Sequence, residues 1–296
     1  MEKMEKKKKL HRWMEKAMNA VFFLCGLLTI LFVILITIFL VINGIPAIRS
    51  IGLLDFLFGT VWASAAAEPS YGILPFILTS LYGTCGAIVI GVPIGLLCAI
   101  FLAKMSPRKV GSTVRNVVDL LAGIPSVVYG LVGMILIVPW VREIFQLPDG
   151  ANLFSAILVL AVMILPSVIS VSEAAIKAVP KEYEEASLAL GATKTETVFK
   201  VVVPAAKSGI VTAVVLGIGR AVGEAMAVMM VAGNVANMPK LFGSVRFLTT
   251  AVASEMSYSS GLQRQALFSI ALVLFLFIMA INLVLNLVVK KGEKDD

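Results

Sequence analysis

The sequence predicts an all-α integral membrane protein with six transmembrane helices. Apolar residues make up 59% of the chain and charged residues 15%, and the mean hydropathy is +0.98. Soluble domains are roughly 45–50% apolar and about 25% charged, so this chain is too apolar for a water-soluble domain. The apolar residues form continuous stretches of about 20 residues or more, the length that a helix needs to cross a bilayer. They lack the period-two alternation of barrel strands.

The first expected span follows a basic segment. Residues 1–16 contain seven Lys and Arg side chains, and residues 17–44 are apolar. A secretory signal has an apolar core of only about 7–15 residues, and no small-residue cleavage site closes this stretch cleanly. We therefore expect a basic N-terminal tail, an uncleaved first transmembrane helix over 17–44, and a loop outside the membrane over 45–72.

The other five spans are expected within residues 73–290, the permease-like membrane domain. Their approximate positions are 73–103, 118–141, 153–171, 205–232 and 265–289. The first of these is longer than a perpendicular helix needs, which indicates a tilt or a kink at Pro93. Gly123 and Pro125 either break a helix or mark the start of the next span. Residues 291–296 form a short tail.

The charges of the loops predict that both termini are cytoplasmic. In this orientation 19 of the 25 Lys and Arg residues fall in cytoplasmic segments and five fall outside. This is the positive-inside bias of membrane proteins. The net charge of +7 does not indicate nucleic-acid binding, because the basic residues lie in the gaps between apolar stretches. The three cysteines lie inside apolar runs without metal-ligand or disulfide spacing, so we interpret them as small apolar side chains.

The loop between the fourth and fifth spans is expected to form two short helices. Pro180 suits the first turn of one helix, and Gly191 can end it. Thr193 and Glu196 have the spacing of a capping box at the start of the next helix. Pro204 marks the return into the membrane. Such a hairpin would give another protein a rigid surface to bind, and an ordinary surface loop is the alternative.

Two charged residues, Arg220 and Glu224, lie inside the fifth expected span. Charged side chains are costly in a bilayer, so they should face the interior of the bundle or a wet cavity. Four residues apart on a helix, they would share a face and lie within reach of each other. A planar guanidinium suits a tetrahedral oxyanion, and Glu224 could neutralise Arg220 when no anion is present. The alternative is a static ion pair that holds the span to a neighbour.

The loop between the fourth and fifth spans resembles the EAA loop of ABC-importer permeases. The matching pattern is Glu185-Ala186-Ser187, then Gly191, then Val201-x-Val203-Pro204. Serine replaces the second alanine, and valines replace isoleucine and leucine. The resemblance implies a type I importer permease (MetI-like) fold, in which residues 177–204 contain a coupling helix that inserts into a cytoplasmic ATPase subunit. The residues to which it assigns this role are Glu184, Glu185, Ala186, Gly191 and Pro204.

Three further segments are similar to the phosphate importer permeases, specifically the PstC type. They are residues 123–133, 217–234 and 248–255, and the resemblance covers roughly residues 70–290. It implies that Arg220 and Glu224 belong to the substrate pathway for phosphate. The glycines and the proline of these segments are candidates for hinges or close packing: Gly123, Pro125, Gly130, Gly217, Gly219 and Gly223. The PstA-type partner permease and the sulfate or molybdate permeases share a looser Arg-Ala-x-Gly-Glu segment, so they are the alternatives.

The chain has no Gly-x-x-x-x-Gly-Lys-[Ser/Thr] phosphate loop, so we expect no ATPase activity of its own, and no catalytic or metal site. The resemblance implies a PstA-like second permease, two PstB-like ATPase subunits that bind ATP and Mg²⁺, and an external PstS-like phosphate-binding protein. It also implies the cytoplasmic (inner) membrane of a prokaryote, with no cofactor and no nucleic acid bound by this chain. An ion-coupled secondary transporter would usually show internal repeats and several intramembrane acids, of which only Glu224 is found. A membrane scaffold or sensor would not need an intramembrane Arg–Glu pair.

Overall fold

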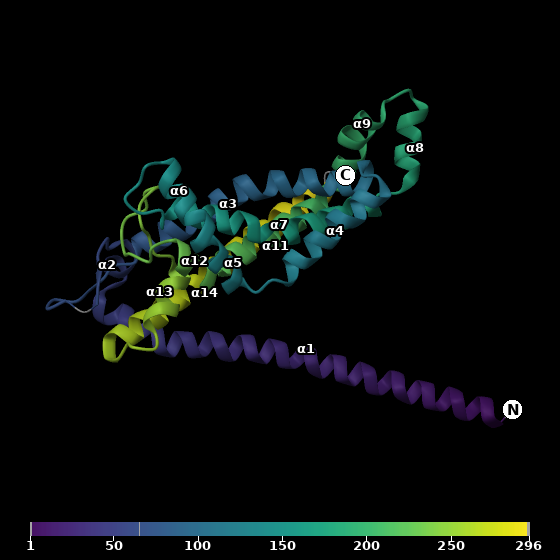
Figure 1. Ribbon diagram of the computed structural model, residues 1–296. Helices are drawn as coiled ribbons and strands as arrows, with labels where there is room; N and C mark the ends of the chain where they lie inside the picture. The colour runs from purple at the N-terminus through teal and green to yellow at the C-terminus, as the bar shows by residue number, and fades with distance from the viewer. Residues whose placement is uncertain (1, 65, 295–296) are drawn as a thin grey trace.

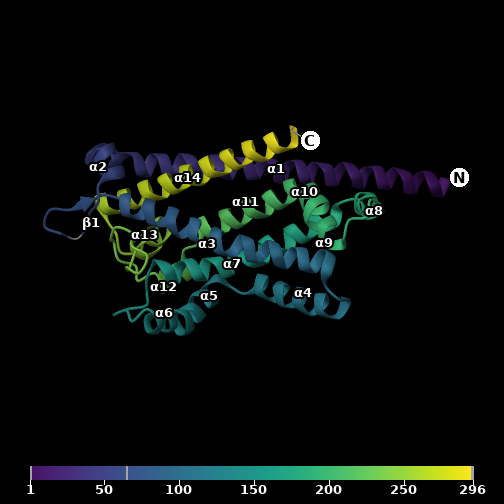
Figure 2. The ribbon, with the colours of Figure 1, turned by 90° about the horizontal axis from the view of Figure 1, so that it is seen from above.

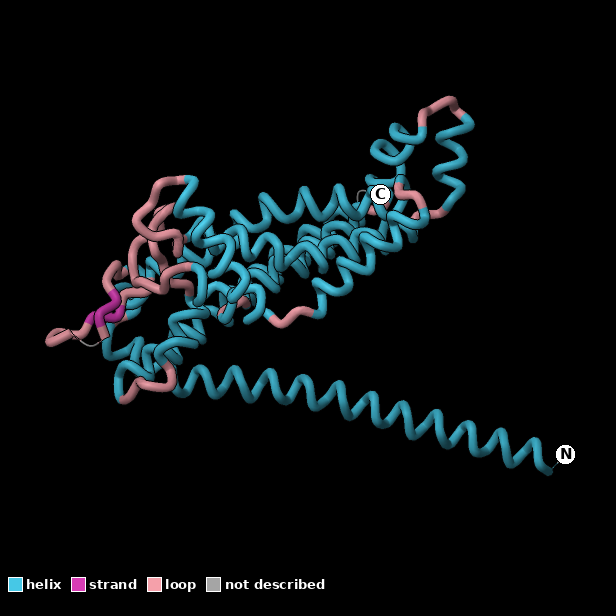
Figure 3. The backbone as a smooth tube through the Cα atoms, viewed as in Figure 1, coloured by secondary structure: helices cyan, strands magenta, loops and turns pink. Residues whose placement is uncertain are grey.

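The chain folds into a bundle of long helices with short elements gathered at both ends (Figures 1 and 3). This computed structural model describes the backbone of residues 2–64 and 66–294, and the side chains of residues 13–64 and 66–284. The helices of the first half are α1 (Glu2–Ile51), α2 (Leu53–Phe58), α3 (Leu74–Ile100), α4 (Arg108–Gly123), α5 (Ser126–Val132) and α6 (Val138–Ile144). Those of the second half are α7 (Leu153–Ala178), α8 (Lys181–Ala189), α9 (Lys194–Thr197), α10 (Val203–Ala205), α11 (Lys207–Gly223), α12 (Met226–Val231), α13 (Leu248–Glu255) and α14 (Gly261–Lys294).

Short elements of two other kinds interrupt the helices. Three π-helical turns are present, η1 (Phe101–Met105), η2 (Gly133–Ile137) and η3 (Val198–Val202). The strands β1 (Trp62–Ala63) and β2 (Ser70–Tyr71) form a small antiparallel hairpin in which Trp62 pairs with Tyr71. Single π-turns inside α-helices are often found at functional sites.

Within the described residues, five helices are long and apolar enough to cross a membrane. They are Trp13–Ile51, Leu74–Met105, Ser126–Ile144, Leu153–Ala178 and Gly261–Val284. A sixth crossing is present if the bent pair Lys194–Ala205 and Lys207–Gly223, which meet at 70°, counts as one span. The predicted helical membrane fold is therefore confirmed, with five or six crossings.

Two boundaries at the start of the chain differ from expectation. The basic segment is helical and continuous with the first span, because α1 runs without interruption from Glu2 to Ile51; its role as a cytoplasmic tail stays a prediction. Its lysines and glutamates are good helix formers, so the helix extends well before the apolar stretch. The expected outer loop over 45–72 contains the last turns of α1, then α2 and the β1–β2 hairpin.

The centre of the bundle is the contact between α3 and α7, and α7 is the most deeply buried of the long helices. Glycines on α3 let the two backbones approach closely. A Cβ added to Gly91 would lie 2.9 Å from the Ala161 carbonyl oxygen, and one added to Gly95 would lie 2.8 Å from Val168. Small residues at such contacts replace the hydrophobic driving force that is missing between helices in lipid.

Helix α1 packs against the bundle only toward its C-terminal end. There Gly44 lies against the backbone of Ser269 on α14, and the Ser269 hydroxyl donates a hydrogen bond of 2.6 Å to the Gly44 carbonyl. Phe39 contacts Phe268 edge to face. The earlier part of α1 extends away from the other helices (Figure 1), and its apolar side chains are exposed, as expected for a helix that faces lipid.

The two ends of the bundle carry different elements. Helices α8 and α9 lie at one end, which we call the α8 end, and the free ends of α1 and α14 lie toward the same end (Figures 1 and 2). The β1–β2 hairpin, α2 and α13 lie at the opposite end, which we call the strand end. An even number of crossings requires both termini to lie on one side. The assignment of that side to the cytoplasm stays a prediction.

A polar network holds the strand end together. Glu255, in the last turn of α13, accepts hydrogen bonds from Arg246, from Trp62 in β1 and from Gln263 in α14. Arg246 also donates to the Asn234 carbonyl at 2.8 Å. The Arg246 and Glu255 side chains are 15% and 19% exposed, so water screens this ion pair only weakly. The network joins β1 to the region between Asn234 and Gln263, which is distant from β1 in sequence.

Replacement of Glu255 by alanine is expected to destabilise the strand end, because three donors lose their shared acceptor. Unpaired buried donors cost about 1–3 kcal/mol, so the thermal unfolding temperature of the detergent-purified chain should fall. Glu68 lies exposed at the tip of the hairpin, and Glu68→Ala is the matched control. An unchanged unfolding temperature for Glu255→Ala would show that the network contributes no stability.

Candidate functional site

Two helices break inside the bundle with the same local geometry. Between α4 and α5 the chain is extended at Ile124 (φ −71°, ψ 129°), and between α11 and α12 it is extended at Glu224 (φ −73°, ψ 130°). At the first break, Pro125 disfavours a helical conformation for Ile124 and then starts α5. The expected fifth span is thus interrupted. The expected third span begins later than predicted, because the helix that can cross the membrane is Ser126–Ile144. Both alternatives for Gly123 and Pro125 are therefore met, since one helix ends there and the next span begins.

The short helices that follow the breaks pack against each other. An added Cβ at Gly130 of α5 would lie 2.8 Å from Ala227 Cα of α12 and 2.8 Å from the Met230 sulfur. Because backbone atoms limit the space, only glycine fits at this position. The two breaks are therefore held together as one site through the contact of α5 with α12.

Each break frees backbone groups that side chains then bind. The Tyr129 hydroxyl donates to the Leu121 carbonyl at 2.7 Å, near the end of α4. The Glu224 carboxylate accepts from the Ala227 amide at 3.0 Å, at the start of α12, and the Thr249 hydroxyl donates to the Glu224 carbonyl at 2.7 Å. Irregular backbone at membrane depth persists only where it is buried in protein or lines a wet cavity.

The predicted pairing of Arg220 with Glu224 is wrong. Helix α11 ends at Gly223, so Glu224 no longer follows the four-residue spacing of a helix, and its carboxylate caps α12. The Arg220 side chain is half-buried and makes no hydrogen bond or ion pair with any residue that the structure describes. It lies close enough to the Tyr129 hydroxyl to interact with it electrostatically. The site thus combines two helix breaks with one unpaired guanidinium.

The candidate hinge and packing residues fall into two groups. Gly130 and Gly217 are packing positions, and an added Cβ at Gly217 would lie 3.1 Å from Val168 of α7. Gly123, Gly219 and Gly223 have open space where a Cβ would lie. These three glycines lie close to the two breaks, so the space beside both breaks stays open. Pro125 begins α5, as described above.

The second predicted site, the hairpin at the α8 end, has the expected two-helix shape. Pro180 precedes α8, and Gly191 follows it with a φ of +86°, a value that favours glycine. The capping box forms as predicted, because the Thr193 hydroxyl accepts from the Glu196 amide while the Glu196 carboxylate accepts from the Thr193 amide. The hydrogen bonds from Thr193 hold the pKa of Glu196 below its usual range. Pro204 lies in α10, just before the 70° bend into α11.

Helix α8 projects from the bundle and contains no buried residue. Glu185 and Ala186 are exposed, whereas Glu184 is partly covered. Leu190, just after the helix, is 90% exposed. Tyr183 and Leu188 of α8 are exposed as well, and exposed apolar side chains that gather on one element are typical of a surface that another protein covers.

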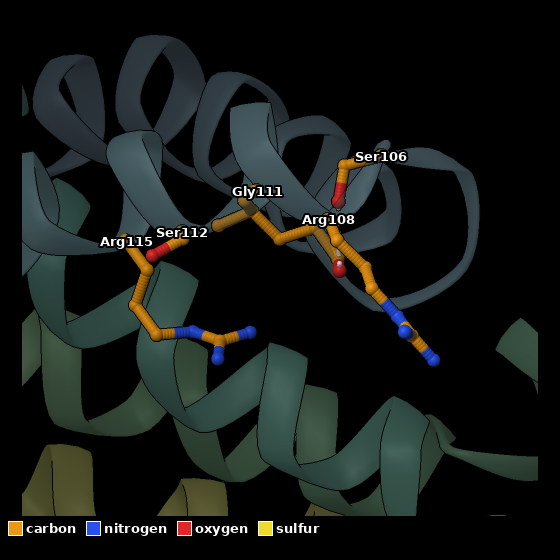
Figure 4. Close-up of a pocket in the computed structure, with 6 residues that line it drawn as sticks. Ser106, Arg108, Gly111, Ser112 and Arg115 are labelled. Carbon is orange, nitrogen blue, oxygen red and sulfur yellow. Dashed lines mark hydrogen bonds between the residues drawn. The ribbon is translucent and has the colours of Figure 1, made fainter.

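A cluster of charged residues near the α8 end was missed by sequence reasoning. Glu173 of α7 is buried and forms ion pairs with Arg115 of α4 and with Lys177, the latter at 2.6 Å. The four-residue spacing of Glu173 and Lys177 was a readable signal. The pairing of Arg115 with Glu173 gave no such signal, because the two residues lie 58 positions apart in the sequence. A cavity of about 230 Å³ adjoins Arg115, and Figure 4 shows its lining residues Ser106, Arg108, Gly111 and Ser112 along the start of α4.

Comparison with known proteins gives matches over most of the chain. Residues 91–293 match the family described as "Binding-protein-dependent transport system inner membrane component". The chain is 39% identical over 267 residues to the probable ABC transporter permease protein YqgH of Bacillus subtilis, covering 87% of this chain and 86% of the relative. It is 33% identical over 302 residues to the phosphate transport system permease protein PstC of Haemophilus influenzae, covering 95% of each. The PstC protein of Pasteurella multocida is 34% identical over 262 residues, covering 82% of this chain and 81% of the relative.

Solved structures with a similar fold include two transporters. A chain from a bacterial alginate ABC transporter in complex with an alginate-bound periplasmic protein has a TM-score of 0.61 at 15% identity, covering 94% of this chain and 95% of that chain. A chain from an inward-facing MetNI methionine ABC transporter has a TM-score of 0.60 at 22% identity, covering 74% and 95%. The three-dimensional arrangement of the helices therefore agrees with the predicted type I importer permease fold.

Replacement of Gly130 by valine is expected to separate α5 from α12, because the new side chain would overlap Ala227. Overpacking of this kind costs about 1–3 kcal/mol, so both the unfolding temperature and the transport activity of the assembled complex should fall. Gly26 of α1 has open space around it, and Gly26→Val is the control for the substitution itself. Normal stability and transport of Gly130→Val would mean that the two breaks do not depend on this contact.

Proposed function

Because the chain belongs to the family of binding-protein-dependent transport system inner membrane components, we propose that it is the permease subunit of an ATP-driven importer and that its substrate is inorganic phosphate. The substrate is supported by PstC phosphate permeases that are 33% and 34% identical to the chain over most of its length. It is also supported by the chemistry of the site. The chain itself supplies the pathway, and its relatives are transport proteins rather than enzymes.

The observation that carries the proposal is the unpaired Arg220 beside the two helix breaks. A cation in a membrane bundle is costly unless an anion or water compensates it. A guanidinium can donate two parallel hydrogen bonds to a phosphate, which a point charge cannot do. Because Glu224 is occupied at α12, Arg220 is free to bind an anion that passes the breaks. Arg220 would thus compensate the charge of phosphate in the part of the pathway where water is scarce.

Glu224 has a different role from the one expected. Its carboxylate satisfies a backbone amide at the start of α12, and its carbonyl is held by Thr249 of α13. Both contacts fix the shape of the break. Glu224 therefore positions the backbone next to Arg220, and it does not compete with the substrate for the guanidinium.

The energy for import comes from other subunits in this proposal. The α8–α9 hairpin, with its exposed Leu190, would be covered by an ATPase that binds ATP and Mg²⁺. The complex would contain a PstA-like second permease, two PstB-like ATPase subunits and an external PstS-like phosphate-binding protein. The proposed location is the cytoplasmic membrane of a prokaryote, with the α8 end in the cytoplasm. Residues 73–290 would then form the permease domain, with residues 177–204 as its coupling segment.

Substitution of Arg220 tests the substrate proposal. Hydrogen bonds to charged groups contribute about 1.5–3 kcal/mol, so Arg220→Gln should reduce phosphate uptake by roughly 10- to 100-fold in vesicles that contain the complete importer. Arg220→Lys should recover only part of it, because an ammonium lacks the bidentate geometry. Arg49→Gln, at the exposed end of α1, is the control. Uptake that is normal in Arg220→Gln, or that excess sulfate abolishes, would contradict the proposal.

Two substitutions of Glu224 separate the capping role from an ion-pair role. An amide oxygen can still accept from the Ala227 amide, so Glu224→Gln should keep most of the uptake. Glu224→Ala removes the cap, which is worth about 0.5–2 kcal/mol, and should lower both stability and uptake. Equal losses in the two variants would indicate that the charge of Glu224 matters, and the capping role would then be wrong.

A further inference from the structure

One ion pair ties the projecting helix α8 to the membrane helices. Lys104 Nζ lies 2.6 Å from Glu184 Oε2, across 80 positions of sequence. Lys104 belongs to the π-turn η1 at the end of α3, and Glu184 belongs to α8. The Lys104 side chain is only 14% exposed and that of Glu184 33%. A short, charge-assisted contact with so little exposure is stronger than an ordinary surface ion pair.

Helix α8 is otherwise held loosely. It has no buried residue, and a conformational break stands at each end, at Pro180 and at Gly191. Its other side-chain hydrogen bond among the described residues joins Ser187 to Thr197 at 2.9 Å, within the hairpin itself. The position of α8 relative to the bundle is therefore set by its two ends, by the Ser187–Thr197 contact and by Lys104.

Lys104, the partner of Glu184, lies in a turn that packs directly against α4. The π-turn η1 places Leu102 in a buried cluster with Val118 of α4 and Ile169 of α7. Only Ser106 and Pro107 separate η1 from the start of α4, and Gly111 packs against Ser106 in this tight connection (Figure 4). Helix α4 in turn ends at the first break, beside the proposed phosphate site. A displacement of Lys104 would therefore move α4, because η1 and its short connection are packed against that helix.

We propose that the Lys104–Glu184 ion pair transmits the movement of α8 to α4 and thereby couples ATP hydrolysis to the opening of the phosphate pathway. This inference rests on the proposed function, in which an ATPase moves α8. Lys104 is a positioning residue, because it acts through α4 and contacts neither ATP nor phosphate. Lys240 provides a control, since it is an exposed lysine in the loop before α13 and lies outside the coupling segment.

The first experiment measures phosphate uptake and ATP hydrolysis together in vesicles that contain the complete importer. Lys104→Met should lower the phosphate moved per ATP hydrolysed by about fivefold or more, the range of a typical coupling energy, while ATP hydrolysis and the amount of co-purified ATPase stay near normal. Lys104→Arg should retain the ratio, and the charge swap Lys104→Glu with Glu184→Lys should restore it. Lys240→Met should leave it unchanged. An unchanged ratio in Lys104→Met, or a swap that assembles but restores nothing, would overturn the proposal.

The second experiment does not depend on phosphate. Spin labels on Glu182→Cys in α8 and Ser112→Cys in α4, with the native cysteines replaced by serine, report the distance between the two helices with and without ATP. With Lys104 present the helices should move together and the distance should stay constant. With Lys104→Met the distance should change when ATP binds, and an equal response with and without Lys104 would overturn the inference. Wild-type vesicles that hydrolyse ATP but import no phosphate would instead contradict the proposed function.

Discussion

A bilayer supplies no water to unpaired backbone groups, and the architecture of this chain follows from that constraint. Most of the chain meets it with continuous helices. The two breaks violate it locally, and each is compensated by a specific side chain: Tyr129 binds the carbonyl freed in α4, and Glu224 binds the amide freed in α12. Because Glu224 is used in this way, Arg220 has no ion-pair partner among the residues that the structure describes. The permease's candidate anion site is therefore a by-product of how the backbone is satisfied.

Most of the fold was readable from the sequence, because hydropathy reports directly which segments can enter lipid. The capping box at Thr193 was readable as well, since its contacts are local. The break at Glu224 was not, because no proline marks it and Gly223 alone is common inside membrane helices. Contact partners distant in sequence, such as Arg115 with Glu173 and Lys104 with Glu184, leave no pattern along the chain. The role of Arg220 as a site residue, which the resemblance to phosphate permeases implied, stays a prediction, and the resemblance did not indicate that Glu224 caps α12.

The bundle separates a rigid part from a movable part. The close α3–α7 contact, built on glycines, and the Glu255 network at the strand end join segments from many parts of the chain. At the α8 end a buried apolar cluster joins α3, α7 and η3, whereas helix α8 itself is connected by polar contacts and short linkers. Tight cores move as units and sparse polar contacts can rearrange, so conformational change should be concentrated at the end where an ATPase would bind.

Helix α1 has a consequence for how the protein tolerates different membranes. Helix α1 lies outside the segment that matches the family. It is anchored to α14 near Gly44 and Ser269, and most of its length faces lipid. An anchored helix of this kind can change its tilt about a single pivot when the bilayer becomes thicker or thinner. Such an adjustment would take place at the periphery of the bundle, away from the two helix breaks.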